Sequence, residues 1–171
     1  MMSSTLGVAG DVRRPPRSAG GEFLTFHLAG ESYGIHILNI QEIRSYSSPA
    51  ALPGAPDFIR GVVNLRGSIV PIIDLRIRFG MPSRAHDEFT AVIVLNIGAH
   101  VIGVVVDSVS DVVTLQDAAV QSAPAFASSA FNTEYMAGIG IADAEMIILL
   151  DVERLVTPSQ LGLIAQAATT A

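Results

Sequence analysis

Few side chains in this sequence could take part in catalysis or metal binding, and their spacing favours neither. Asp107 and Asp111 lie four residues apart, but the run Val104-Val105-Val106 before them predicts a strand. Two carboxylates at this spacing on a strand share a face, yet they are too far apart to cooperate as acid and base. We therefore expect a solvated structural role for both. The histidines show neither the i, i+4 spacing of a helical metal site nor a pairing with cysteine: His27, His36, His86 and His100.

The motifs of common catalytic sites are absent. The chain contains no cysteine, which excludes disulfide bonds, thiolate metal sites and a cysteine nucleophile. It also lacks a glycine-rich phosphate loop, a nucleophile elbow and an HExxH helix. We expect no catalytic residues, no metal and no cofactor, so the sequence favours a binding module over an enzyme.

The strongest candidate for a binding side chain is Arg66. It lies between the predicted strands 61–65 and 69–73, at the tip of a hairpin in which Gly67 can supply the positive φ of the turn. The segment could be no more than a strand and its turn. However, folding does not require arginine at a hairpin tip, and a guanidinium offers a fork of donors to a partner's carboxylate or carbonyl.

The composition predicts a folded protein with a substantial core. The chain has 171 residues, of which 50% are hydrophobic and 15% charged, and its mean hydropathy is +0.48. This length allows one domain, or two small ones that share a core. The net charge of −6 makes a nucleic acid a poor candidate partner, because phosphate binding requires a basic surface.

Two segments need separate interpretations. Residues 1–21 are rich in Ser, Gly, Arg and Pro and lack the apolar run of a signal peptide, so we expect a disordered leader. Residues 89–106 carry no Asp, Glu, Lys or Arg and approach the length of a membrane span. Their Val and Ile content and the interruptions at Asn96, Gly98 and His100 instead predict a buried hairpin, and we expect no membrane insertion.

An internal repeat organises the rest of the chain. Alternation of Leu24, Phe26 and Leu28 predicts a strand, and a small polar turn leads to a second strand at residues 33–37. Placing Gly34 on Gly103 (103 − 34 = 69) aligns this hairpin with a second one, and an offset of 77 residues aligns the segment from residue 61 with the segment from residue 138. One β unit therefore occurs twice.

Each unit holds about five short strands, enough for a small barrel that leaves few exposed edges. The sequence thus predicts an all-β fold of two small barrels. Helix is expected only at residues 117–121, in part of 125–135 and in the tail 159–168, whose alanine-rich end should fray.

The sequence resembles the CheW family, the adaptors of bacterial chemotaxis. The likeness covers about residues 22–156 and rests on segments in a common order: 22–26, 33–37, 41–44, 61–74 and 103–112. The most specific of them is Asn64-Leu65-Arg66-Gly67, which is followed by Pro71 and Asp74.

The resemblance implies two SH3-like five-stranded β-barrels packed together, and we place the first in residues 22–86, the second in 87–156 and a partly helical or frayed tail in 157–171. It also implies a non-enzymatic cytoplasmic adaptor, monomeric when free, that is recruited to membrane-associated receptor arrays. Its partners would be the regulatory domain of the histidine kinase CheA and the helical tip of chemoreceptors, which would bind in a groove between the barrels.

Site residues follow from the same resemblance, position by position. Kinase binding is expected at Ile40, Glu42 and Gly61, although the residues around Glu42 alone indicate only a strand end with solvated charges. Receptor coupling is expected at Arg66, Val92 and Val112. Gly138 also matches a sensitive position, where a glycine could serve folding alone.

Two rival interpretations remain open at this point. The same fold could belong to a CheA-like regulatory domain or to an adaptor fused to a phosphoreceiver, although the remaining residues hold no kinase or receiver segment. Alternatively, the chain could be a small β-barrel enzyme or ligand carrier, which would need polar groups converging on a cavity.

Overall fold

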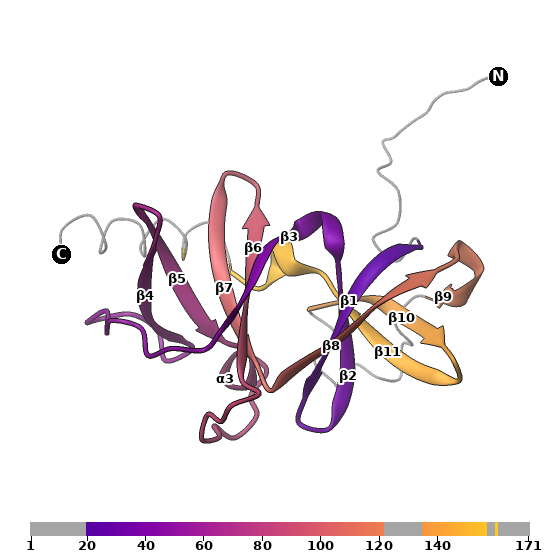
Figure 1. Cartoon of the computed structure of the whole chain (residues 1–171), viewed down its shortest axis with the longest axis horizontal. Coiled ribbons are helices and arrows are strands. Elements are labelled where there is room, and N and C mark those ends of the chain that lie inside the picture. Colours follow the sequence, from indigo (N-terminus) through magenta and orange to yellow (C-terminus); the bar gives the residue numbers. More distant parts are fainter. Residues whose placement is uncertain (1–19, 122–134, 157–159, 161–171) are drawn as a thin grey trace.

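The strands form two mixed sheets that lie side by side along the long axis of the molecule (Figure 1). The computed structural model describes residues 20–121, 135–156 and 160. The first sheet has the strand order β8-β1-β2-β11-β10-β9 and the second β3-β6-β7-β5-β4. The all-β fold of two SH3-like barrels is confirmed, with the difference that one sheet gains a sixth strand, β9, of two residues.

The six-stranded sheet consists of β1 (Gly21–Leu28), β2 (Glu31–His36), β8 (Ser108–Leu115), β9 (Val120–Gln121), β10 (Met136–Ala142) and β11 (Glu145–Leu150). The five-stranded sheet consists of β3 (Ile40–Ser45), β4 (Ile59–Leu65), β5 (Ser68–Asp74), β6 (Ala91–Ile97) and β7 (His100–Val106). Short helical turns connect them: the α-helix α3 (Leu75–Arg78) and the 3-10 helices η1 (Ile37–Asn39), η2 (Asp117–Ala119) and η5 (Val152–Arg154).

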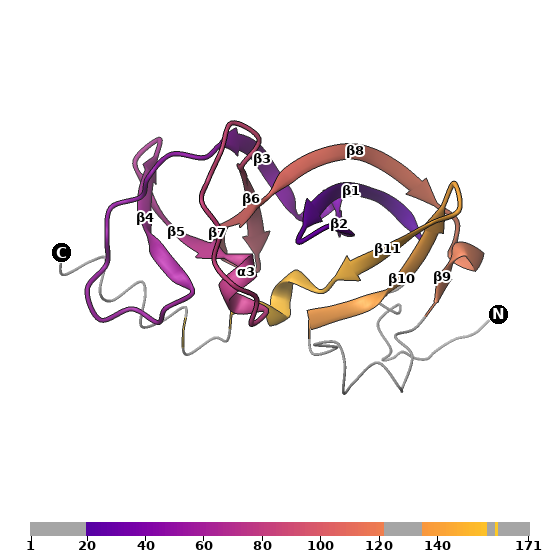
Figure 2. The ribbon, with the colours of Figure 1, turned by 90° about the horizontal axis from the view of Figure 1, so that it is seen from below.

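The two barrels exchange strands, which corrects the expected division into residues 22–86 and 87–156. β1 and β2 pair with β8 and β11 of the second repeat, and β3 and β5 pair with β6 and β7. In Figure 2, β8 accordingly arches across the barrel that contains β1 and β2. The chain crosses between barrels after β2 and again after β7, so the five-stranded barrel is the continuous segment β3–β7, whereas the six-stranded barrel combines β1 and β2 with β8–β11.

The internal repeat appears in the structure with its predicted offsets. Gly34 pairs with Leu149 in one parallel ladder, and Gly103 pairs with Ile72 in the other. These pairs are equivalent, because 103 − 34 = 69 and 149 − 72 = 77. The two barrels are therefore related by the repeat even in the way they exchange strands.

Three hydrophobic clusters fill the described part of the molecule. The largest lies between the sheets and takes side chains such as Phe26 and Ile35 from one and Ile93 and Val104 from the other. Smaller clusters fill the interiors of the five-stranded and six-stranded barrels. Since β6 and β7 face the central cluster on one side and a barrel interior on the other, both faces are buried, as expected for the hairpin in the charge-free run 89–106.

The five-stranded sheet closes into a barrel next to Gly61. Its edge strands are β3 and β4, and Ala50, which follows β3, forms a bridge to Val62 with N···O distances of 2.9 and 2.8 Å. A Cβ on Gly61 would lie only 2.1 Å from the Ala50 carbonyl oxygen, and Gly61 has a φ of +149°. Glycine at this position therefore allows the two edges to meet.

Helix is as scarce as expected, but the predicted positions are only partly tested. Within 117–121, only Asp117–Ala119 forms a 3-10 turn before β9 begins. The predictions for 125–135 and 159–168 fall almost entirely outside the described residues, as does the leader. No helix in the described part of the chain is long and apolar enough to cross a membrane.

Candidate functional site

Arg66 and Glu42 form an ion pair across the seam of the five-stranded barrel, where its edge strands β3 and β4 face each other. Nη2 of Arg66 donates to both carboxylate oxygens of Glu42, at 2.6 and 3.2 Å. Glu42 is on β3, one edge of the sheet, and Arg66 is at the β4–β5 tip, next to the other edge. The expectation that Arg66 is simply an exposed donor fork is therefore incomplete, because part of the fork already binds a carboxylate within the chain.

The β4–β5 turn explains how Arg66 is presented. Arg66 has a φ of +51° and Gly67 a φ of +90°, and the side chain of Asn64 accepts a hydrogen bond from the Gly67 amide at 2.8 Å. Leu65 is buried in the barrel interior and anchors the turn from below. A backbone conformation that is unfavourable for arginine is thus held by its neighbours, while 66% of the Arg66 side chain stays exposed.

The electrostatics of the pair favour full charge on both groups. The hydrogen bond from Arg66 lowers the pKa of Glu42, and Arg44, whose Nη1 is 3.9 Å from Glu42 Oε2, acts in the same direction. The Glu42 carboxylate raises the pKa of Arg66 in return. The seam therefore presents a fixed pair of opposite charges that a partner can engage by competing for either member.

The other two residues expected at the kinase surface lie on the two edge strands of this barrel, Ile40 on β3 and Gly61 on β4, and serve mainly the fold. Ile40 is half-buried and packs against the central cluster. Gly61 is buried at the Ala50–Val62 closure. Of these three residues, Glu42 is thus the one with charged atoms available to a partner.

The residues expected to couple to receptors are not together. Val92 is only 6% exposed and lies inside the five-stranded barrel, in the same cluster as Leu65 below Arg66. This burial leaves Val92 little surface for direct contact with a receptor. Val112 is 55% exposed on β8, in the other sheet. Gly138 is buried beside a bulge in β10 that is equivalent to the bulge beside Gly61 in β4.

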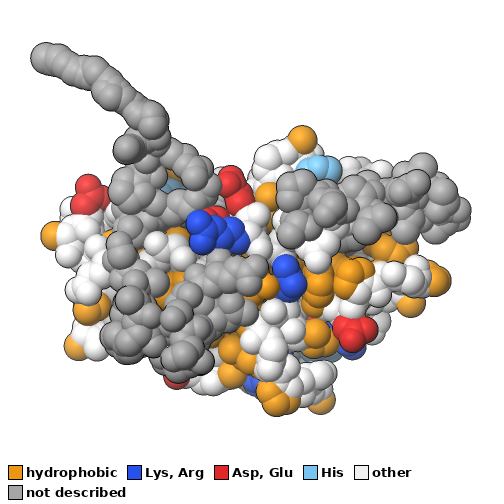
Figure 3. Space-filling model, turned by 180° about the vertical axis from the view of Figure 1, so that it is seen from behind, with side chains coloured by type: hydrophobic (Ala, Val, Ile, Leu, Met, Phe, Trp, Pro, Cys, Tyr) orange, Lys and Arg blue, Asp and Glu red, His pale blue; other side chains and the backbone are white. Residues whose placement is uncertain are grey.

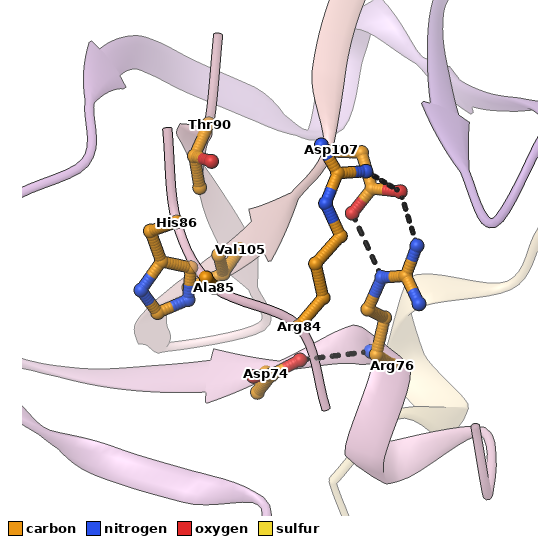
Figure 4. Close-up of a pocket in the computed structure, with 8 residues that line it drawn as sticks. All are labelled: Asp74, Arg76, Arg84, Ala85, His86, Thr90, Val105 and Asp107. Atoms are coloured by element: carbon orange, nitrogen blue, oxygen red, sulfur yellow. Dashed lines mark hydrogen bonds and ion pairs between the residues drawn. The ribbon is translucent and has the colours of Figure 1, made fainter. Parts of the chain in front are cut away.

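A polar cluster at Asp107 was not expected from the sequence. Its carboxylate accepts hydrogen bonds from Arg76 Nε at 2.9 Å and Nη2 at 2.7 Å, and Arg84 Nη1 lies 3.1 Å away (Figure 4). The Arg76 hydrogen bond holds the pKa of Asp107 below its usual range. Asp107 is thus structural, as expected, but not solvated, since its side chain is 14% exposed. The repeat could have pointed to this role. Position 38, which is equivalent to 107, carries leucine, so the pattern shared by the two repeats does not require an acidic residue at 107.

Arg78 occupies a second unexpected position, between the two repeats. Its guanidinium lies 4.3 Å from the ring centroid of Phe58 and 5.1 Å from that of Tyr135, and its Nε donates to the Leu155 carbonyl at 2.7 Å. Phe58 and Tyr135 are themselves equivalent, because 135 − 58 = 77. Cation–π contacts to both rings therefore join the two repeats.

The pocket in Figure 4 does not suit a small-molecule ligand. It is lined in part by His86, Thr90 and the Asp107 cluster, and its volume of about 10 Å³ admits about one water molecule. No group of three or more His, Asp or Glu side chains that could hold a metal occurs in the part of the chain that the structure describes. On the face seen in Figure 3, arginine atoms form small separate patches with hydrophobic atoms between them.

Comparison with known proteins identifies the family. The family model described as a CheW-like domain matches residues 22–160. Chemotaxis protein CheW of Klebsiella aerogenes is 48% identical over 151 residues, which cover 88% of this chain and 90% of that protein. Chemotaxis protein CheW of Rhizobium meliloti is 32% identical, with 84% of this chain and 91% of that protein covered.

A solved structure agrees with both the sequence relatives and the strand arrangement. The scaffolding protein TtCheW from Thermoanaerobacter tengcongensis superimposes with a TM-score of 0.76 at 30% identity, covering 82% of this chain and 95% of that one. The two exchanged SH3-like barrels, the family match and these relatives together show that this chain belongs to the CheW family of chemotaxis proteins.

Proposed function

We propose that the protein is a non-enzymatic adaptor that couples chemoreceptors to the histidine kinase CheA. In this role it acts in the cytoplasm at membrane-associated receptor arrays and binds the regulatory domain of the kinase and the helical tip of a receptor. Support comes from the family membership and from the CheW names of its relatives.

The observation that carries the proposal is the Glu42–Arg66 ion pair. Family resemblance ties Glu42 to the kinase contact and Arg66 to receptor coupling, and the Arg66 Nη2 to Glu42 Oε1 distance is 2.6 Å. A partner that binds Arg66 leaves the Glu42 carboxylate without its strongest counter-charge. Equally, a partner that binds Glu42 leaves the Arg66 guanidinium without its carboxylate. Two binding events at this seam are therefore linked in free energy, which is what coupling requires.

Rigidity of the fold supports the same mechanism. The central cluster spans both sheets, so the barrels share one core rather than moving as separate domains. The shared core thus limits how far a contact on one barrel can move relative to a contact on the other. Such a module can make kinase activity depend on receptor conformation by binding alone, without chemistry.

The test is a reconstituted array of receptor, CheA and this chain, in which kinase activity is measured with and without attractant. Arg66→Ala should leave the chain folded and bound to the kinase but should weaken the attractant response. Receptor control that survives unchanged in Arg66→Ala contradicts the assignment of Arg66 to coupling.

A charge-swapped variant distinguishes a role of the ion pair in partner recognition from a role in closing the barrel. Glu42→Arg combined with Arg66→Glu retains an opposite-charge pair across the seam but reverses both charges. If the pair serves partner recognition, this variant remains folded and fails in coupling; if the pair serves only to close the barrel, coupling is restored relative to the single variants. Arg60→Ala, at an exposed position on neighbouring β4, is the control for loss of an arginine.

The ligand-carrier alternative gains no support from the cavity beside Asp107. Small-molecule sites are typically about 300–1,000 Å³, whereas this cavity admits about one water.

A further inference from the structure

Two segments of the described chain cross between the barrels, and one of them, from β7 to β8, contains Asp107. Besides the two hydrogen bonds from Arg76 and the ion pair with Arg84, Oδ2 of Asp107 accepts a hydrogen bond from the Ala29 amide at 2.9 Å. One carboxylate thus has four nitrogen donors within 3.1 Å.

These donors come from both barrels. Ala29 is in the turn between β1 and β2 of the six-stranded barrel, and it has a φ of +53°, a conformation that costs free energy for alanine. Arg76 is on α3, which directly follows β5 of the five-stranded barrel. Arg84 is on the loop before β6, where it also binds Asp87 at 2.8 Å. The carboxylate therefore connects a turn of one barrel to a helix and a loop next to the other.

The second crossing, from β2 to β3, is equivalent by the repeat offsets but runs through the 3-10 helix η1 and carries different side chains. By the repeat offsets, Leu38 is equivalent to Asp107, Glu153 to Arg76 and Gly98 to Ala29. Gly98 has a φ of +58°, close to that of Ala29, so the turns correspond. However, leucine and glutamate cannot form the carboxylate–guanidinium pair, and Leu38 is 81% exposed.

We propose that Asp107 is an inter-barrel clamp that, within the described residues, is present at only one of the two equivalent crossings. It fixes the β1–β2 turn of the six-stranded barrel against α3 of the five-stranded barrel, while leucine at position 38 cannot do so at the β2–β3 crossing. The relative motion that the shared core permits is therefore concentrated at the Leu38 crossing. For the adaptor function proposed above, on which this consequence rests, the clamp decides at which crossing a partner can change the angle between the barrels.

The geometry suits a positioning role. A bidentate arginine–carboxylate pair is directional, and the side chains of Asp107 and Arg76 are each 14% exposed, so water competes weakly for their hydrogen bonds. Arg84 is more exposed, at 44%, and adds a peripheral contact. Asp107→Asn removes the charge and one of the two acceptor oxygens, so the contacts to both arginines and to the Ala29 amide cannot all be kept.

The test measures the distance between the barrels directly and needs neither kinase nor receptor. The chain contains no cysteine, so nitroxide labels attach only at introduced sites. Ser68→Cys places a label on the exposed β4–β5 tip of one barrel, and Thr114→Cys places one on exposed β8 of the other. Pulsed electron double resonance then gives the distance distribution between the labels.

Asp107→Asn should shift or broaden this distribution, and Arg84→Gln, which keeps the Arg76 pair, should do so to a smaller extent. Asp111→Asn makes the same chemical change at an exposed site on β8 and should leave the distribution unchanged. Val113→Ala weakens the interior of the six-stranded barrel without touching the clamp, and it controls for a general loss of stability.

The proposal is overturned if the distribution in Asp107→Asn coincides with that in Asp111→Asn, or if Val113→Ala broadens it equally. If Asp107→Asn does not fold, the distance distribution of Arg84→Gln is used in its place. An unchanged distribution in Arg84→Gln also overturns the proposal. Because no partner is added, a failure here leaves the proposed adaptor function standing.

Discussion

Closure of the five-stranded barrel at Gly61 gives a prediction whose size can be worked out from the structure. In Gly61→Ala, the new Cβ would lie 2.1 Å from the Ala50 oxygen, a backbone atom that cannot turn aside. The Ala50–Val62 bridge must open and lose two hydrogen bonds, worth about 1–3 kcal/mol together. The positive φ of Gly61 adds about 1–2 kcal/mol for an alanine. We expect a total loss of about 2–5 kcal/mol in the free energy of unfolding.

Gly67→Ala is the matched control, because Gly67 also has a positive φ, of +90°, but a Cβ added there would meet nothing within 4 Å. It should lose only the conformational part, about 1–2 kcal/mol. Urea unfolding of both variants, followed by circular dichroism, measures the difference. If the two variants differ by less than about 0.5 kcal/mol, which is the usual limit of such comparisons, the close approach does not hold the barrel together and the reasoning is wrong.

Three further predictions follow from the site. Val92→Ala should lower the free energy of unfolding by about 1.5–3 kcal/mol, because two buried methyl groups are removed and a cavity remains; thermal or urea unfolding measures this, and an unchanged stability would contradict the burial of Val92. Glu42→Gln and Arg66→Ala should each leave the midpoint of urea unfolding almost unchanged, because the pair is solvent-exposed; a large shift would make it a structural rather than a recognition pair. Asp107→Asn should cost about 1.5–3 kcal/mol at neutral pH. Since folding lowers the pKa of Asp107, its contribution is present above the unfolded pKa of about 3.9 and is lost as the pH falls through the folded value, so the parent and the variant should converge in stability in acid.

The sequence was sufficient for those parts of the fold that depend on local pattern and on the repeat. Alternation placed Leu24, Phe26 and Leu28 on one face of β1, and all three are in the central cluster. The offset of 69 residues aligned Gly34 with Gly103, and both glycines pair with equivalent strands. Such features repeat because the same physical constraint acts in both halves of the chain.

The exchange of strands could not be predicted in this way. β1 could pair with β3 of its own repeat or with the equivalent β8, and the two arrangements bury the same side-chain pattern. The same limit applied to the site, because the family resemblance tied Glu42 and Arg66 to different partners, and the sequence gave no distance between them. Asp107 was missed because its donors lie on segments distant in sequence, at Ala29, Arg76 and Arg84.

The central claim is that this chain binds the kinase through the surface that carries Glu42. Titration calorimetry of the purified chain with the regulatory domain of CheA from the same organism tests it most directly, with Glu42→Arg as the comparison. The account predicts specific, saturable binding by the parent chain and a clear loss of affinity in Glu42→Arg, while the variant remains folded. Absence of binding by the parent chain, or equal affinity in Glu42→Arg, would contradict it.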